Sequence, residues 1–278
     1  MAVLDQLGSW PVDNVAAALV TPNGIETYGH TEHIFQLASV TKLPVAYGAL
    51  VAVEEGAIEL EQPAGPPGST VRHLLAHASG LSFRMDAIRR KPGERRIYSS
   101  TGYEVLADFI ASETDIPFPD YLREAVFEPL GMTRTMLVGS AGHGARSTVA
   151  DLTYFLGELL QPRLISPQLY QDAVSVQYPG LNGVVPGYGP QRPCDWGLGF
   201  ELHDHKEPHW LGHESSPAAY GHFGQAGTFL WVDPPLRSGC VVLTDRPFDE
   251  WAKPLWADFN DSVVVSIRET RGDARHTS

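Results

Sequence analysis

The stretch FQLASVTKLPVAYGAL, residues 35–50, places a serine and a lysine at the start of an otherwise apolar helix. Ser39 and Lys42 are three residues apart, so they lie on one face of a first helical turn. We expect this helix to run from about Ser39 to Glu55 and to end at Gly56. A Ser-x-x-Glu pair would form a capping box, whereas the helix macrodipole disfavours a lysine at this end. Lys42 is therefore an unusual residue for this position.

The apolar residues on both sides of Lys42 predict that it is buried. Desolvation and the helix dipole both disfavour the ammonium form and would lower the lysine pKa from its usual value of ~10.4. A neutral amine one turn from Ser39 can accept the hydroxyl proton, which a serine nucleophile has to lose. The helix start would also direct backbone N–H groups at a developing oxyanion. The alternative is that Ser39 only caps the helix and Lys42 extends to solvent.

Composition excludes several classes of protein. The chain has 278 residues, 43% of them hydrophobic and 19% charged, with a net charge of −13. These values predict a packed globular protein that does not bind nucleic acid or an anionic membrane. Cys194 and Cys240 form no disulfide framework, and no apolar run is long enough to cross a bilayer. The first basic residue is Lys42, so we expect no signal peptide and a cytoplasmic location.

The order of the predicted elements indicates the fold. VAAALV and IETYGH flank the turn TPNG and predict a hairpin, and strand-like runs return after residue 190. The residues between them are apolar at helical spacing, and a closing helix covers about 248–266. We predict an α/β (α+β) fold with an antiparallel sheet of N- and C-terminal strands flanked by helices, residues 1–70 and 190–278. A helical subdomain, residues 71–189, lies beside it, with the active site in the cleft between them.

Six motifs resemble those of a known superfamily. In order they are ASVTK (38–42), VRHLLAHASGL (71–81), RIYSSTGYEVLADFI (96–110), FEPLGMTRT (127–135), STVADLTYFL (147–156) and GHFGQAGTFLWVDP (221–234). Together they resemble the serine β-lactamases and penicillin-binding proteins, on the branch that holds class C β-lactamases, D-aminopeptidases and lactamase-like esterases. The resemblance runs from about residue 15 to 245 and implies the β-lactamase/transpeptidase-like fold.

The resemblance implies a role for each matching residue. Ser39 matches the acylated nucleophile and Lys42 its partner base. Tyr98 would carry protons to the leaving group and activate the deacylating water, with His222 opposite it. Gly224 would let the substrate approach the strand, and the backbone N–H of Gln225 would join that of Ser39 in an oxyanion hole.

Two departures from the superfamily pattern favour ester substrates. Ser100 stands where the superfamily has an Asn that binds the amide side chain of β-lactams and peptides. His222 and Phe223 stand where a Lys and a Thr hold the β-lactam carboxylate. We therefore predict a serine hydrolase that cleaves small-molecule esters through an acyl-enzyme, without a metal or organic cofactor. The alternatives are a β-lactamase or D-amino peptidase/carboxypeptidase-type amide hydrolase, and a binding or sensor protein without turnover.

Other candidate residues have simpler interpretations. His77 is predicted to be structural. The basic run RRKPGERR, residues 89–96, is predicted to be a solvated loop, with steering of an anionic substrate as the alternative. A second cluster has the spacing of a metal site but lies in a predicted loop with Pro208 and Gly212, which favours solvated side chains: His203, His205, His209 and His213. The sequence indicates no oligomeric state.

Overall fold

Strands from the two ends of the chain pair into one antiparallel sheet in the computed structural model, which describes residues 2–85 and 87–276. The strand order is β2-β1-β11-β10-β9-β8. The predicted hairpin is confirmed as β1 and β2, whereas only the end of the strand-like run WGLGFEL forms a strand, β8. The strands are β1 (Val15–Thr21), β2 (Gly24–Tyr28), β8 (Glu201–Leu202), β9 (Tyr220–Gly224), β10 (Thr228–Asp233) and β11 (Ser238–Thr244).

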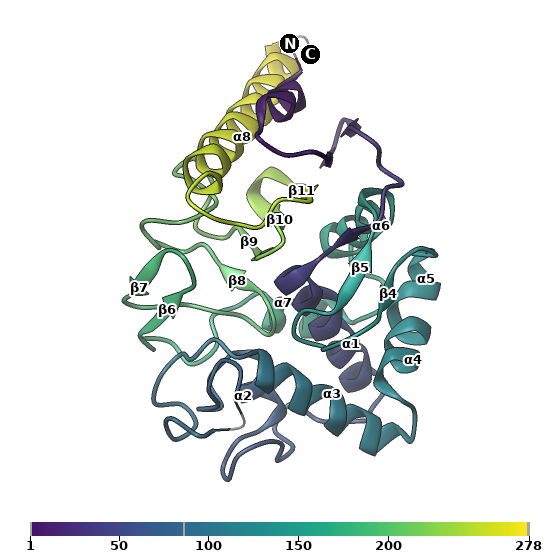
Figure 1. Cartoon of the computed structure of the whole chain (residues 1–278), viewed down its shortest axis with the longest axis vertical. Coiled ribbons are helices and arrows are strands. Elements are labelled where there is room, and N and C mark those ends of the chain that lie inside the picture. The colour runs from purple at the N-terminus through teal and green to yellow at the C-terminus, as the bar shows by residue number, and fades with distance from the viewer. Residues whose placement is uncertain (1, 86, 277–278) are drawn as a thin grey trace.

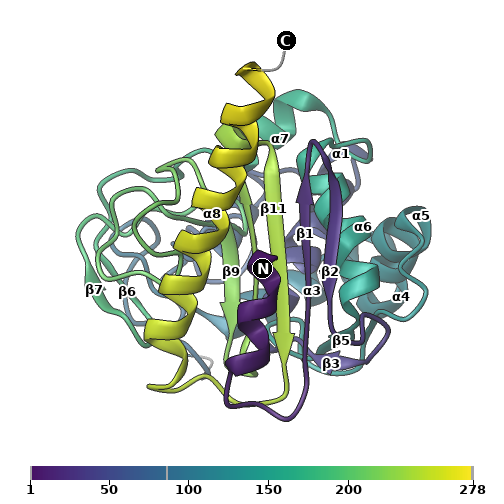
Figure 2. The same ribbon diagram turned by 90° about the horizontal axis from the view of Figure 1, so that it is seen from above.

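Both faces of this sheet are covered, which explains why its central strands are apolar throughout. In β10, Phe229 and Trp231 join one hydrophobic cluster, while Leu230 and Val232 join the other. The long helix α8 (Ala252–His276) and the 3₁₀ turn η1 (Val3–Ser9) lie on the first face, and α6 (Val149–Leu160) packs against β1 and β11 on the second (Figure 2). The predicted α/β fold with an antiparallel sheet flanked by helices is thus confirmed.

The motif that carries Ser39 and Lys42 leads into the central helix of the molecule. Residues 38–41 form the 3₁₀ turn η2 (Ala38–Thr41), and α1 (Lys42–Glu54) follows it directly. Every residue of α1 from Lys42 to Ala52 is buried, as expected for a helix that is apolar all round. It packs on α3 (Ser100–Thr114) and α4 (Phe118–Leu122). The helix therefore begins three residues later than predicted.

The middle of the chain contains short strands as well as helices (Figure 1). Residues 71–189, predicted to form a mainly helical subdomain, also include short strands at residues 136–137, 145–147 and 183–185. The helix α6, which belongs to this range, packs on the large sheet. Among the described residues, no helix is long and apolar enough to span a bilayer. The remaining elements are α2 (Val71–Leu75), η3 (Arg123–Phe127), α5 (Glu128–Leu130), α7 (Pro167–Ala173), β3 (Phe35–Gln36), β4 (Met136–Leu137), β5 (Ala145–Ser147), β6 (Gly183–Val185), β7 (Gly189–Gln191) and η4 (Pro234–Leu236).

Candidate active site

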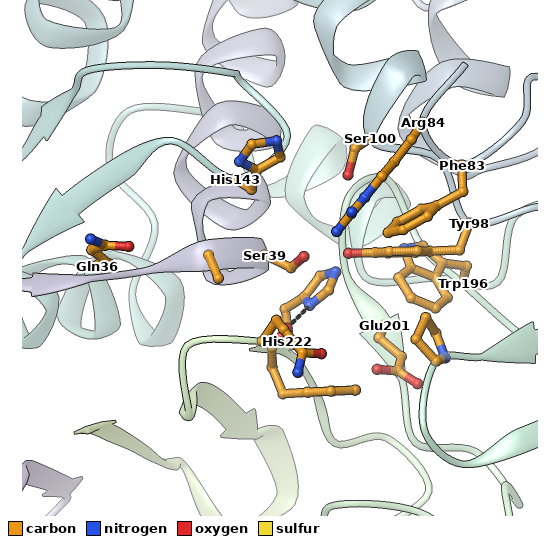
Figure 3. A pocket seen from close by; sticks show the side chains of 14 residues that line it. Gln36, Ser39, Phe83, Arg84, Tyr98, Ser100, His143, Trp196, Glu201 and His222 are labelled. Carbon is orange, nitrogen blue, oxygen red and sulfur yellow. Dashed lines mark hydrogen bonds between the residues drawn. The ribbon is translucent and has the colours of Figure 1, made fainter. Parts of the chain in front are cut away.

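A cavity of about 520 Å³ brings most of the predicted site residues together (Figure 3). Ser39, Tyr98, Ser100, His222 and Gln225 all line it, although they are far apart in the sequence. Other residues of the wall were not predicted from the sequence: Gln36, Phe83, Arg84, His143, Pro186, Trp196 and Glu201. The cavity is thus the meeting point of the turn before α1, the segment before α3 and the end of β9.

Ser39 is held on a sharp turn between β3 and α1. Ala38 has a φ of 45°, a left-handed conformation that non-glycine residues rarely adopt. Two hydrogen bonds hold the backbone of Leu37, the residue before Ala38. Leu37 N donates to Ala145 O at 3.0 Å, and Thr228 Oγ1 donates to Leu37 O at 2.8 Å. Neither η2 nor α1 has a side-chain cap, so Ser39 does not act as the helix cap considered from the sequence. Its side chain faces the cavity instead.

Lys42 is fully buried, and three oxygens surround its amine. Nζ lies 3.3 Å from Ser39 Oγ, 3.1 Å from Ser100 Oγ and 2.6 Å from Gly142 O. A neutral amine has two N–H donors and one lone pair. Gly142 O can only accept, and Ser100 Oγ can accept the second N–H. The lone pair is then available for the hydroxyl proton of Ser39, which is the arrangement a general base requires.

The environment of Lys42 also favours the neutral amine. Burial lowers the pKa of Lys42 from 10.5 to about 7; the charge of Glu104 opposes this shift, and that of Arg84 adds to it. Lys42 takes part in no ion pair with any described carboxylate. About half of the molecules therefore carry the free base near pH 7. The burial and lowered pKa that the sequence predicted are both present.

Tyr98 is positioned by the helix that follows it. Ser99 caps α3, because its Oγ accepts from Gly102 N at 2.9 Å. The Tyr98 ring packs between Phe83, at 5.6 Å between centroids, and His77, at 4.7 Å. Its hydroxyl points at Ser39 and is within hydrogen-bonding reach of it. Burial raises the pKa of Tyr98 despite that bond, so the phenol keeps its proton at neutral pH.

His77 supports this segment, as the sequence predicted. Its Nδ1 accepts a hydrogen bond from Ser99 N at 3.1 Å, directly after Tyr98. Burial, together with the charge of Lys42, lowers the pKa of His77 well below its usual value. The imidazole is therefore a neutral structural group that fixes the backbone beside Tyr98.

His222 presents an uncharged acceptor to the cavity. Its Nδ1 lies 2.7 Å from Phe223 O, and since a carbonyl only accepts, Nδ1 carries the proton. Burial, strengthened by the charge of Lys42, lowers the pKa of His222 to about 4. Nε2 is consequently unprotonated, and it is buried without a hydrogen-bond partner among the described residues. It can accept a hydrogen bond from a group that enters the cavity.

The end of β9 approaches the nucleophile very closely at Gly224. A Cβ atom at this position would lie 2.4 Å from Leu37 O and 3.1 Å from Ser39 N. Gln225 follows directly and is anchored to Phe248, whose N donates to Gln225 O at 2.8 Å and whose O accepts from Gln225 Nε2 at 2.7 Å. Only glycine leaves the space between the strand and the Ser39 backbone open.

Glu201 is a buried carboxylate in the cavity wall that the sequence did not reveal. It accepts hydrogen bonds from His209 Nε2 and Trp210 Nε1, each at 3.0 Å. Burial alone would raise its pKa, but the charge and hydrogen bond of His209, with Lys206 and His222, lower the pKa to about 2. Glu201 therefore stays ionised, and this side of the cavity is negative. Glu201 lies in the strand-like, mostly apolar run WGLGFEL, and nothing in that pattern indicates that its carboxylate belongs to the site.

The four clustered histidines have separate partners. His203 Nδ1 is 3.1 Å from Ser216 O, and His209 bonds to Glu201. In exposed positions, His205 Nε2 lies 3.7 Å from Asp204 Oδ1 and His213 pairs with Glu207. Among the described residues no group of three or more His, Cys, Asp and Glu side chains is arranged to hold a metal ion.

The basic run 89–96 is only partly the solvated loop that we predicted. Residues 89–91, 94 and 95 are exposed, but Arg96 is buried. Its guanidinium donates to Cys194 O at 3.0 Å, Ala76 O at 2.5 Å and Gln177 O at 2.6 Å. Arg96 thus holds together three segments that are far apart in the sequence. The spacing of residues within the basic run gives no sign of these partners.

Comparison with known proteins identifies the family. A family model described as Beta-lactamase matches residues 15–264. A solved beta-lactamase from Mycobacterium bovis is 54% identical, with a TM-score of 0.94 over 96% of this chain and 99% of that chain. A penicillin-binding protein of Bacillus subtilis is 30% identical in an alignment of 138 residues that covers 38% of this chain and 31% of its own length. A putative D-alanyl-D-alanine carboxypeptidase of Salmonella heidelberg is 26% identical in an alignment of 254 residues that covers 73% of this chain and 57% of its own length.

The chain therefore spans about a third to just over half of the length of these two curated relatives. The family match covers most of the chain and includes the segments that carry Ser39, Lys42, Tyr98 and His222. This chain belongs to the beta-lactamase family, within the superfamily of serine β-lactamases and penicillin-binding proteins.

Proposed function

We propose that this protein is a serine hydrolase that cleaves carboxylic esters of small molecules through an acyl-enzyme on Ser39. The observation that carries the proposal is the buried Lys42 amine, which has a pKa of about 7 and three oxygen neighbours, one of them Ser39 Oγ. A base with a pKa near the working pH is the most effective proton acceptor for a weak nucleophile.

The reaction proceeds in two halves. Ser39 Oγ attacks the ester carbonyl carbon while its proton passes to Lys42 Nζ. The backbone N–H groups of Ser39 and Gln225 stabilise the oxyanion, and Tyr98 donates its proton to the leaving alcohol oxygen as the C–O bond breaks. Lys42 returns a proton to Tyr98. Water then attacks the acyl-enzyme, its proton passes to the neutral amine of Lys42, and Lys42 returns that proton to Ser39 Oγ as the ester bond to Ser39 breaks.

The charges in the cavity favour an ester over a β-lactam or a peptide carboxylate. His222 is neutral where the superfamily has a lysine that holds the substrate carboxylate, and Glu201 is ionised in the same wall. A substrate carboxylate beside His222 would meet the negative charge of Glu201, whereas Arg84, a cation of the cavity wall, lies over the Phe83 ring at 4.9 Å. The descriptions of the relatives as a beta-lactamase and a putative carboxypeptidase favour amide chemistry as the alternative.

A comparison of p-nitrophenyl acetate and butyrate with nitrocefin tests this choice of substrate. We expect kcat/KM for the esters to exceed that for nitrocefin by at least about 100-fold, since one unfavourable buried charge contact costs several kcal/mol. Nitrocefin turnover that equals ester turnover would favour the β-lactamase alternative. A stable acyl adduct without turnover of any substrate would favour a sensor protein.

The pH dependence of ester hydrolysis should follow Lys42. The free base is the active form, so kcat/KM should rise about tenfold per pH unit below pH 7 and level off above about pH 8. Tyr98 stays protonated, because burial raises its pKa above the usual 10. Rates measured from pH 5 to 9.5 in buffers of constant ionic strength give this profile. A rate that stays constant from pH 5 to 7 would contradict this assignment and would fit His222 as the base, because burial lowers its pKa to about 4.

A further inference from the structure

A largely apolar groove lies beside the catalytic cavity. Its volume is about 350 Å³, and it shares Phe83, Tyr98 and Pro186 with the cavity. Ile97 and Val184 complete its apolar walls. The two spaces therefore adjoin each other across Phe83, Tyr98 and Pro186, and an acyl chain on Ser39 would pass these residues to enter the groove.

Two arginines also line the groove: Arg95, which is exposed and adds a cation to the lining, and Arg96, which is buried. The Arg96 guanidinium is engaged with three backbone carbonyls, so only its stem is available to the groove. The facing wall is the hairpin β6–β7, in which Val184 is 44% exposed while both of its neighbours are buried. This wall is fixed to the groove floor, because Arg96 N donates to Asn182 O at 3.0 Å and a Cβ at Gly183 would lie 2.8 Å from Arg96 Cβ.

The opposite side of the cavity has a different character. Gln36, His143 and Gln225 line it, and all three residues are exposed. A polar alcohol product has to leave for water after the first half of the reaction, whereas the acyl group stays bound until the second. An apolar acyl chain gains most free energy on the apolar side.

We propose that the groove bounded by Phe83, Tyr98, Val184 and Pro186 binds the alkyl part of the acyl group, and that Val184 determines the preference for chain length. The inference rests on the proposed ester hydrolysis. Each methylene that leaves water in the groove should raise kcat/KM by roughly two- to fourfold. The preferred substrates are therefore esters of medium-chain or similarly apolar acids rather than acetates.

The test compares p-nitrophenyl acetate, butyrate and hexanoate on wild type, Val184→Asp and Val184→Trp. Wild type should prefer hexanoate to acetate by at least about tenfold in kcat/KM. Both variants should lose most of that preference and keep their acetate rate within about threefold, because one makes the groove polar and the other fills it. Val265→Asp is the matched control, since Val265 is 39% exposed on α8, and it should keep the wild-type preference.

Binding of methyl- and pentylboronic acid, measured by calorimetry, separates this inference from the proposed function. A boronic acid forms a reversible adduct with a nucleophilic serine and places its alkyl group where the acyl chain would lie. A tenfold preference for pentylboronic acid that Val184→Asp removes would support the groove even if no ester were hydrolysed. Equal affinity of wild type for the two acids, or a preference retained by both Val184 variants, would overturn the groove assignment. No binding of either acid would instead contradict Ser39 as the nucleophile, and with it the proposed function on which the inference rests.

Discussion

Replacing Lys42 by methionine should lower kcat/KM for p-nitrophenyl butyrate by about 10³-fold, a typical loss for removal of a general base. Methionine fills the same buried volume but cannot accept the Ser39 proton. Lys42→Arg should be equally inactive, because a guanidinium stays protonated at all relevant pH values. Steady-state rates on variants with a native circular dichroism spectrum measure the loss.

Lys206 offers a matched control for the Lys42 substitution. It is also buried, but its Nζ donates to the carbonyls of Asp195, at 2.7 Å, and Leu202, whereas that of Lys42 contacts Ser39 and Ser100. Lys206→Met should lower thermal stability yet keep kcat/KM within about threefold of wild type. A Lys42→Met protein with more than a tenth of the wild-type rate would show that Ser39 is activated by another group.

Gly224→Ala should lower kcat/KM by about 10²-fold, the cost of losing one oxyanion donor. The new Cβ would lie 2.4 Å from Leu37 O, 2.6 Å from Thr228 Oγ1 and 3.1 Å from Ser39 N. Two of these three atoms are backbone, so the strand end has to move away from Ser39. That movement displaces Gln225 N–H from the oxyanion position. The loss should fall mainly on kcat, because the donor acts in the transition state.

Gly157→Ala is the control for an added methyl group. Gly157 lies in α6, and a Cβ added there would meet no neighbouring side chain or distant backbone atom within 4 Å, so alanine should fit. Alanine in a helix interior is more favourable than glycine by up to about 1 kcal/mol, so thermal stability should rise slightly and activity should not change. Full activity in Gly224→Ala would contradict the role of the β9 end in catalysis.

The sequence predicted the parts of the site that depend on local spacing. Ser39 and Lys42 are three residues apart, and the apolar residues around them indicate burial, so the lowered lysine pKa follows from the sequence alone. Tyr98, Ser100 and His222 were found only through the resemblance, because lone tyrosines, serines and histidines carry no signal. The structure places all of them in one cavity wall.

The remaining features depend on tertiary packing. Glu201 and Trp196 belong to a run with the pattern of an ordinary strand, and the loops that bring them to His222 have no repeating pattern. The 3₁₀ turn at Ala38–Thr41 has only four residues, too few for their apolar spacing to distinguish it from the first turn of an α-helix. Arg96 lies in a run that predicts a solvated basic loop, since its three carbonyl partners come from distant segments.

The role of Ser39 as the nucleophile can be measured by intact-protein mass spectrometry with a fluorophosphonate probe, run beside ester hydrolysis on wild type and Ser39→Ala. We expect one probe adduct on wild type, located at Ser39 by peptide mapping. We expect neither an adduct nor turnover for Ser39→Ala, whose fold should be unchanged. Ester hydrolysis by Ser39→Ala at the wild-type rate, or an adduct on a different serine, would contradict the proposed mechanism.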